Sequence, residues 1–223
     1  MRGVKLWKRE NMILDLIYPP VCGICNRINK KYLCEKCEKN LKPYEIYSIK
    51  PCNKKDIYYD YHIKILRYEN KVRDIIIDFK FNEKAYIYKT LKKIILKNEK
   101  IYGFLKKYDI IIPVPMYKNK KWTRGYNQAE LIANDIAKDI KVCIEKNNLI
   151  KIKDTKKQST LSKNERKLNV KNAFSVLKPD KILNKKVILF DDIFTTGSTV
   201  NECSKILKKY GAKEIAVLTI AVD

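Results

Sequence analysis

The order of hydrophobic and polar positions predicts alternating strands and helices from about residue 61 onward. Residues 62–68 alternate between apolar and polar side chains as a strand does, whereas residues 70–81 and 86–96 place apolar side chains at helical spacing. Short apolar runs predict buried strands over 109–115, 187–190 and 215–220, and periodic segments predict helices over 127–140 and 199–210. Such alternation is typical of an α/β fold with a parallel sheet.

The residues before 61 differ in character and predict a separate small module. We therefore divide the chain into an N-terminal helix and metal-binding module over residues 1–60 and an α/β domain over residues 61–223. Within the second part, residues 151–171 are polar and follow neither period, which predicts a mobile loop with one helical turn.

The N-terminal module carries two Cys-x-x-Cys pairs separated by eight residues. Each pair brings two thiolates close enough to share one ion, so together they predict a tetrahedral structural zinc site. Its ligands would be Cys22, Cys25, Cys34 and Cys37. Two disulfides, a redox pair or an iron–sulfur cluster are the alternatives, and a reducing cytosol favours zinc over them. The scattered thiols are predicted to be packing residues, namely Cys52, Cys143 and Cys203.

The chain is strongly basic and poor in glycine and histidine. Its 223 residues include 49 lysines and arginines against 25 acids, and the net charge of +24 attracts nucleic acid, anionic membranes or phosphorylated ligands. Codon bias toward lysine is an equally simple explanation of the net charge, and in that case the charged side chains only form a solvated surface. The six glycines form neither a G-x-G-x-x-G dinucleotide loop nor a Walker A loop, and the single histidine, His62, excludes two-histidine metalloprotease motifs.

Two carboxylates and a run of hydroxyls follow the apolar run 187–190. Backbone N–H groups, hydroxyls and a helix N-terminus suit a phosphate, and adjacent carboxylates suit a vicinal diol or a Mg2+ that the ligand carries. A phosphate next to a diol describes a ribose 5-phosphate. A helix-capping role and a Walker-B-like metal site are the alternatives, and the missing Walker A loop removes the second. The residues are Asp191, Asp192, Thr195, Thr196, Gly197, Ser198 and Thr199.

Residues 187–199 resemble the phosphoribosyl pyrophosphate motif of type I phosphoribosyltransferases, although Phe194 is bulkier than the aliphatic residue common there. Residues 113–131 resemble the P-V-P…R-G-F-N-Q-x-x-x-L segment of ComF-type competence proteins, and residues 158–174 resemble the Q-x-x-L loop of that family. With the four-cysteine module, the resemblance spans roughly residues 10–223. Relatives often carry arginine where this chain has Lys118 and Lys121, a change that keeps the charge but loses a bidentate grip on phosphate.

The resemblance implies a type I phosphoribosyltransferase-like parallel sheet flanked by helices, with a small N-terminal four-cysteine zinc module. It also implies a phosphoribosyl pyrophosphate ligand, or a related ribose 5-phosphate, that arrives with Mg2+. The cationic loop 151–171 would close over this ligand, and a solvated loop that touches nothing is its alternative. Besides the motif at 191–199, the implied ligand-binding residues are Arg124, Gly125, Tyr126 and Arg166.

Two functions compete on these grounds. The first is a competence protein that aids uptake of single-stranded DNA in natural transformation, with a helicase partner implied by the family. The second is a nucleotide-salvage phosphoribosyltransferase, which would transfer a ribose 5-phosphate to a nitrogen base. The zinc module and the Q-x-x-L loop favour the first. An active domain would catalyse pentosyl transfer, but no catalytic residue is assigned, because His62 is expected to be a strand residue.

The basic segment 106–124 is interleaved with aromatic residues and predicts contact with single-stranded DNA. The expected contacts are Lys118, Lys120, Lys121 and Trp122, with the alternative that the aromatic rings pack against the sheet. No apolar run approaches the roughly 20 residues of a membrane span. We therefore expect a cytoplasmic protein, at the inner face of the membrane where the competence role requires it.

Overall fold

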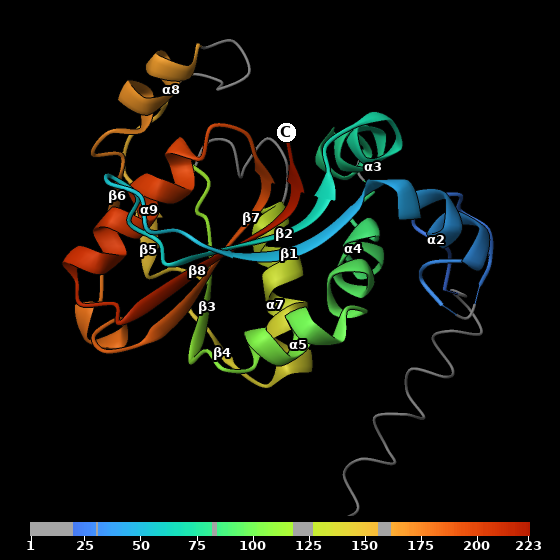
Figure 1. Cartoon of the computed structure of the whole chain (residues 1–223), viewed down its shortest axis with the longest axis horizontal. Helices are drawn as coiled ribbons and strands as arrows, with labels where there is room; N and C mark the ends of the chain where they lie inside the picture. Colours follow the sequence, from blue (N-terminus) through green and yellow to red (C-terminus); the bar gives the residue numbers. More distant parts are fainter. Residues whose placement is uncertain (1–19, 30, 82–83, 118–126, 156–161) are drawn as a thin grey trace, which may run out of the picture.

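A six-stranded sheet forms the centre of the protein (Figure 1). The computed structural model describes residues 20–29, 31–81, 84–117, 127–155 and 162–223. The strand order is β1-β2-β8-β7-β3-β4, and every neighbouring pair is parallel except β1 and β2, which are antiparallel. The strands are β1 (Glu45–Pro51), β2 (Tyr61–Arg67), β3 (Ile110–Pro113), β4 (Cys143–Ile144), β7 (Lys186–Phe194) and β8 (Glu214–Val222). A separate antiparallel pair joins β5 (Leu149–Lys151) to β6 (Phe174–Val176).

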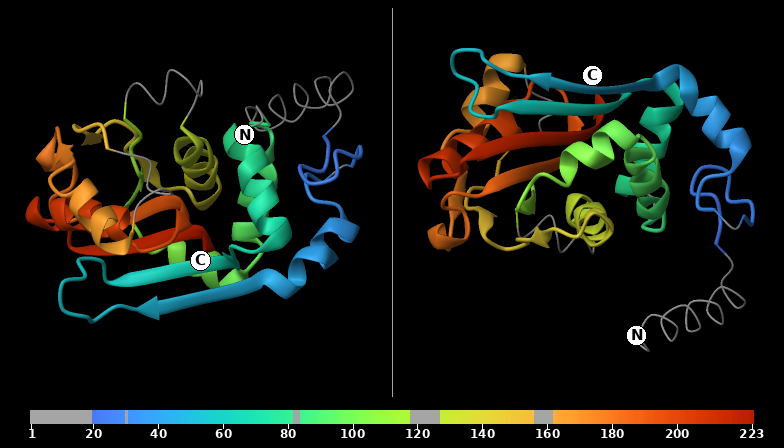
Figure 2. Two further views of the ribbon diagram at one scale, coloured as in Figure 1. Left: turned by 90° about the horizontal axis from the view of Figure 1, so that it is seen from above. Right: turned by 60° about the horizontal axis from the view of Figure 1, so that its bottom comes forward.

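Helices cover both faces of this sheet (Figure 2). Because side chains alternate along a strand, Ile188 and Phe190 of β7 pack into one apolar cluster and Val187 and Leu189 into the other. The first cluster includes α3 (Asn70–Phe81), α4 (Ile87–Leu96), α5 (Glu99–Leu105) and α7 (Gln128–Ile140). The second includes α9 (Ser198–Lys209) and the β5–β6 pair. The two faces of the sheet are therefore covered by different layers, one of four helices and one of α9 with the β5–β6 pair. Both layers extend to the end of β7.

Most of the predicted elements of the α/β part are confirmed to within a few residues. Helix α3 has the predicted bounds, α4 and α7 each begin one residue later than predicted, and α9 begins and ends one residue earlier. Strand β7 is longer than predicted, because its pairing with β8 continues as far as Phe194 opposite Val222. The two carboxylates at 191 and 192 therefore lie within the last part of the strand, where β8 holds their backbone.

Several elements have no counterpart in the sequence prediction. Helix α5 and the short strands β4, β5 and β6 are among them, as are α2 (Glu35–Leu41) and β1 in the N-terminal part. The loop 151–171 contains the two-turn helix α8 (Lys163–Val170), which is longer than the single turn expected. Ser162 and Glu165 form a capping box at its start, and this explains why the helix begins there. Two short 3-10 helices, Lys42–Tyr44 and Pro179–Lys181, complete the described chain.

The four-cysteine segment packs on helix α4 and shares a core with the α/β part. Cys22, Leu33 and Leu41 belong to the same apolar cluster as Ile87 and Leu91 of α4. Polar contacts accompany this packing, since the backbone N–H of Gly23 donates to Thr90 Oγ1 at 3.1 Å and Thr90 donates to the carbonyl of Tyr32. Strand β1 then carries the chain from this segment into the sheet, so the sheet takes one of its strands from residues before 61.

Among the described helices, none is long and apolar enough to span a membrane.

Candidate functional site

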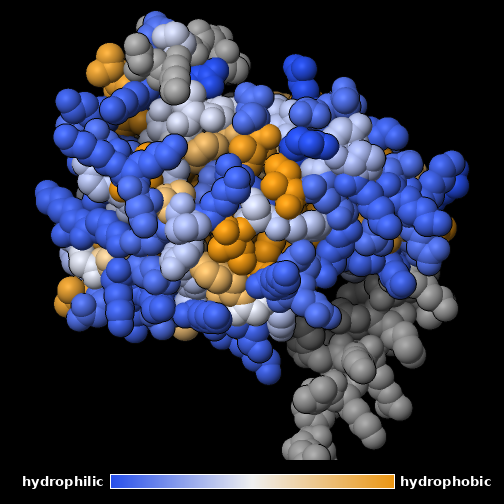
Figure 3. Space-filling model, viewed as in Figure 1, coloured by the Kyte–Doolittle hydropathy of each residue, from blue (hydrophilic) through white to orange (hydrophobic). Residues whose placement is uncertain are grey.

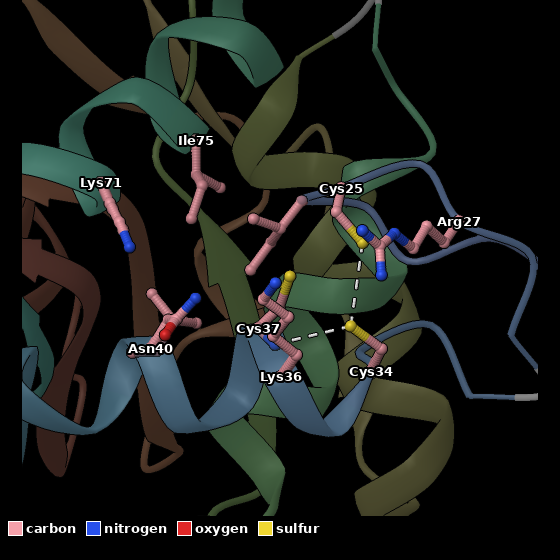
Figure 4. Close-up of a pocket in the computed structure, with 10 residues that line it drawn as sticks. Cys25, Arg27, Cys34, Lys36, Cys37, Asn40, Lys71 and Ile75 are labelled. Carbon is pink, nitrogen blue, oxygen red and sulfur yellow. Dashed lines mark hydrogen bonds between the residues drawn. The ribbon is translucent and has the colours of Figure 1, made fainter.

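The sulfur atoms of the four N-terminal cysteines form one cluster. All four lie within 4.8 Å of one another, and the Sγ atoms of Cys25 and Cys34 are 3.8 Å apart. A tetrahedral zinc ion with Zn–S bonds of about 2.3 Å needs sulfurs about 3.8 Å apart, so the cluster fits such an ion. Figure 4 shows the side chains of Cys25, Cys34 and Cys37 meeting beside α2, at the edge of a pocket of about 260 Å³.

Two of the four thiols have shifted pKa values, in opposite directions. Burial raises the pKa of Cys22, but hydrogen bonds from the backbone N–H groups of Cys34, Cys25 and Ile24 outweigh it and bring that pKa down to about 7. Burial and the neighbouring thiols instead raise the pKa of Cys37 well above its usual range. Four thiolates this close repel one another unless a cation lies between them, which fits a structural metal ion.

The second site lies at the carboxyl end of β7, where the strand turns into α9. A shallow hollow here is lined by the strand end, the turn and the first turn of the helix. Its polar residues are those of the predicted motif, namely Asp191, Thr195, Thr196, Gly197, Ser198 and Thr199. The hydroxyls of Thr196 and Ser198 lie 2.9 Å apart, next to the N-terminus of a twelve-residue helix. Hydroxyls and N–H groups at a helix N-terminus suit a phosphate.

Asp191 and Asp192 face different layers of the protein. Asp192 forms an ion pair with Lys80 of α3, whose Nζ lies 2.8 Å from its Oδ2. Asp191 is on the α9 side, where its charge acts on the buried thiol of Cys203. Burial raises the pKa of Asp191 to about 7; the charge of Asp192 adds to this, and Lys80 opposes it. The pair therefore combines two carboxylates in unequal environments at one edge of the sheet.

Gly197 is the residue that the turn requires to be glycine. It has a φ of 72°, and a Cβ at this position would lie 2.5 Å from Cζ of Phe194. Phe194, the bulky departure from the common motif, thus closes the inner side of the turn. Its ring also lies 4.2 Å from that of His62, centroid to centroid.

His62 is a core residue of β2, as expected. Its side chain is 3% exposed, and its Nε2 lies 3.0 Å from Thr219 Oγ1. Burial, helped by the charge of Lys64, lowers the pKa of His62 to about 3. The only imidazole of the chain is thus neutral at physiological pH and shielded from the hollow.

Arg166 reaches the motif from helix α8. Its Nη1 donates to Thr195 Oγ1 at 3.2 Å, so the loop 151–171 touches the turn through the residue that the sequence singled out. A second tie, from the backbone N–H of Asn172 to Glu202 of α9 at 2.9 Å, holds the end of the loop on the same helix.

The remaining predicted residues lie outside the described part of the chain. These are Arg124, Gly125 and Tyr126 of the expected pyrophosphate loop, and Lys118, Lys120, Lys121 and Trp122 of the expected DNA contact. Figure 3 shows hydrophilic residues spread over most of one face, around a central apolar patch.

The sequence prediction missed Lys80, which nothing in the spacing of α3 distinguishes from other lysines. It gave no role to Gln128, and it identified Asn127 only as a cap residue for the helix 127–140, which is confirmed. Asn127 caps α7 and donates to the carbonyl of Val114 at 3.3 Å, while Gln128 donates to the carbonyl of Lys80 at 3.4 Å. Both residues lie in the R-G-Y-N-Q segment, and this position was the feature of the sequence that could have indicated their roles.

Comparisons with known proteins agree with this geometry. The phosphoribosyl transferase domain model matches residues 126–222, and the double zinc ribbon domain model matches residues 13–54. The described residues contain one four-cysteine cluster.

Relatives extend over most of the chain. Competence protein F of Haemophilus influenzae is 34% identical over 210 residues, which cover 87% of this chain and 92% of that protein. DNA utilization protein YhgH of Escherichia coli is 27% identical, with 92% of each chain covered. Competence protein ComFC of Streptococcus pneumoniae is 26% identical, covering 71% of this chain and 67% of the relative. The four-cysteine cluster, the parallel sheet and the motif at the end of β7 thus occur together in a chain that belongs to the ComF family of competence proteins.

Proposed function

We propose that this chain serves in the uptake or use of DNA through a phosphoribosyltransferase-like domain that binds phosphoribosyl pyrophosphate or a related ribose 5-phosphate. The observation that carries the proposal is that Asp191 lines the same hollow as the hydroxyl turn at the N-terminus of α9, with Asp192 next to it in β7. The role in DNA uptake or use is supported by relatives named as competence and DNA utilization proteins.

Each part of the ligand has chemical partners at this site. The turn from Thr195 to Thr199 would hold the 5-phosphate through hydroxyls, N–H groups and the helix dipole. The two carboxylates would accept hydrogen bonds from the ribose hydroxyls. Mg2+ would arrive with the diphosphate and neutralise its charge. Arg166 would add a cation beside the turn.

The nucleic-acid part of the proposal concerns the basic segment 106–124. Lys118, Lys120, Lys121 and Trp122 would bind single-stranded DNA through phosphate contacts and base stacking. We also propose that the protein acts with a helicase partner and is located at the inner face of the membrane.

The test is isothermal titration with phosphoribosyl pyrophosphate and Mg2+. Replacing both carboxylates, as Asp191→Asn with Asp192→Asn, should weaken binding at least tenfold, because two charge-assisted hydrogen bonds to the diol are lost. Asp180→Asn, an exposed acid elsewhere on the surface, is the matched control and should leave binding unchanged. Equal affinity in a folded double variant would refute the site. Consumption of the ligand with a purine or pyrimidine base would instead favour nucleotide salvage.

A further inference from the structure

Lys80 forms a shielded ion pair with one of the two site carboxylates. Its side chain is 19% exposed and that of Asp192 13%, and Nζ lies 2.8 Å from Oδ2. Charges that are partly removed from water interact more strongly than surface pairs. Removing one member leaves the other without its counter-charge in a poorly solvated place. Asp192 is therefore held in one orientation by a residue from a different layer of the fold.

The backbone of Lys80 is itself fixed. Lys80 lies in the last turn of α3, and its carbonyl accepts a hydrogen bond from Nε2 of Gln128, a side chain that is 2% exposed. The neighbouring Asn127 ties the start of α7 to the carbonyl of Val114, just beyond β3. Two consecutive amides thus connect the end of α3, the start of α7 and the chain after β3. The ammonium group extends from a well-anchored point.

We propose that Lys80 is a positioning residue for recognition of a ribose diol, and this rests on the function proposed above. It holds Asp192 with its free lone pairs toward the 2- and 3-hydroxyls of the sugar, while Asp191 approaches from the α9 side. A carboxylate that is already oriented loses little conformational freedom when the diol binds. The benefit depends on both hydroxyls being present. Lys80 thereby determines selectivity for ribose over 2-deoxyribose.

This distinction matters in a protein that meets DNA. Deoxyribose phosphates have the same phosphate and lack the 2-hydroxyl, so the phosphate turn alone does not reject them. A carboxylate held in place does reject them, because without the 2-hydroxyl it loses a charge-assisted hydrogen bond. The Lys80–Asp192 pair would keep the site for ribose phosphates in the presence of DNA fragments.

The experiment compares ribose 5-phosphate with 2-deoxyribose 5-phosphate by isothermal titration. The natural protein should bind ribose 5-phosphate at least about tenfold more tightly than 2-deoxyribose 5-phosphate, because the deoxy compound lacks one charge-assisted hydrogen bond. Lys80→Met should reduce this preference to about twofold, whereas Lys80→Arg should retain most of it because the cation remains. Lys84→Met is the control, since Lys84 pairs with Asp78, outside the motif.

The outcomes separate the two proposals. If the natural protein binds neither sugar phosphate nor phosphoribosyl pyrophosphate, the proposed function fails and this inference fails with it. If Lys80→Met remains folded and keeps the full preference, only the inference is overturned. An equal loss for both sugars would show a merely structural role and would overturn it as well. Should Lys80→Met unfold, Lys80→Ala, which also removes the group that holds Asp192, decides by the same comparison.

Discussion

The ring of Phe194 occupies the space that a side chain at Gly197 would need. A Cβ there would lie 2.5 Å from Cζ of the ring, and the backbone at Gly197 has a positive φ of 72°. The residue that departs from the common motif is thus matched to the glycine of the phosphate turn. The shape of the turn is set from inside the fold as well as by its own residues.

Replacing Gly197 by alanine should therefore destabilise the turn and weaken ligand binding. We expect a loss of about 1–3 kcal/mol in the free energy of unfolding, from the left-handed backbone and the clash with the ring. The same replacement in a Phe194→Leu background should cost less, because the clash is relieved while the backbone strain remains. Chemical denaturation of the four proteins of this double-mutant cycle measures the difference. Equal costs in both backgrounds would show that the ring does not contact the turn.

Loss of one cysteine ligand should remove the metal. Cys34→Ser should reduce bound zinc from about one ion per chain to near zero in elemental analysis, because a tetrahedral site needs all four ligands. The control is Cys143→Ser, since Cys143 is exposed and lies outside the cluster. Undiminished zinc in Cys34→Ser, or none in protein purified under reducing conditions, would contradict the assignment.

The contact between the cysteine segment and α4 depends on one hydroxyl. Thr90 is fully buried, and its Oγ1 accepts from the N–H of Gly23 and donates to the carbonyl of Tyr32. Thr90→Val removes both of these hydrogen bonds, although the N–H of Gly23 also donates to the carbonyl of Tyr32 at 3.1 Å and keeps that partner. The loss of two buried hydrogen bonds should lower the free energy of unfolding by about 1–2 kcal/mol. Thr90→Ser keeps the hydroxyl and should cost clearly less. A valine variant as stable as the serine variant would mean that the direct hydrogen bond from Gly23 to Tyr32 is enough to hold this contact.

His62 should make the fold sensitive to mild acid. Its pKa is about 3 in the folded protein and about 6.5 when the ring is exposed, so below pH 6.5 the unfolded state binds a proton that the folded state does not. The free energy of unfolding should then fall by about 1.4 kcal/mol per pH unit from 6.5 toward 3. His62→Gln removes this slope and keeps a partner for Thr219. Between pH 7 and 5 the natural protein should lose about 2 kcal/mol more than the variant. Parallel curves would rule the effect out.

Binding of single-stranded DNA should be salt-sensitive and tolerant of sequence. The logarithm of the binding constant should fall by about 0.7 per phosphate neutralised for each tenfold rise in salt. Neutralising Lys118, Lys120 and Lys121 together should weaken binding several-fold and flatten this slope. The control neutralises Lys178, Lys181 and Lys185, which are exposed and precede the start of β7. An equal loss in the control would show that the basic charge acts generically.

Local patterns predicted the elements that depend on local sequence. The β7–α9 unit, α3 and α7 could be read because their apolar periods and capping residues lie within one segment. The cysteine cluster was readable for the same reason, since its ligands lie between Cys22 and Cys37.

Features that depend on distant partners were not predictable. Strand β1 is half-buried at the edge of the sheet, and its register shifts between Glu45 and Ser48, so its alternation is weak. The length of β7 was set by β8, which follows a helix later in the chain. The ion pair between Lys80 and Asp192 joins segments far apart in sequence, and no pattern in either segment points to the other.

The pairing of β2 with β8 sets an order of events during synthesis on the ribosome. Strand β2 forms its parallel ladder with Glu214–Val222, so it waits for a partner that is translated only after the other strands of the sheet. The cysteine cluster needs only a short local segment and can take up metal while translation continues. Contacts of such long sequence separation form slowly. The nascent chain should therefore gain a metal-bound N-terminal segment early and complete its sheet only after β8 has left the ribosome. In cells short of zinc, the growing chain would lack that first folded element.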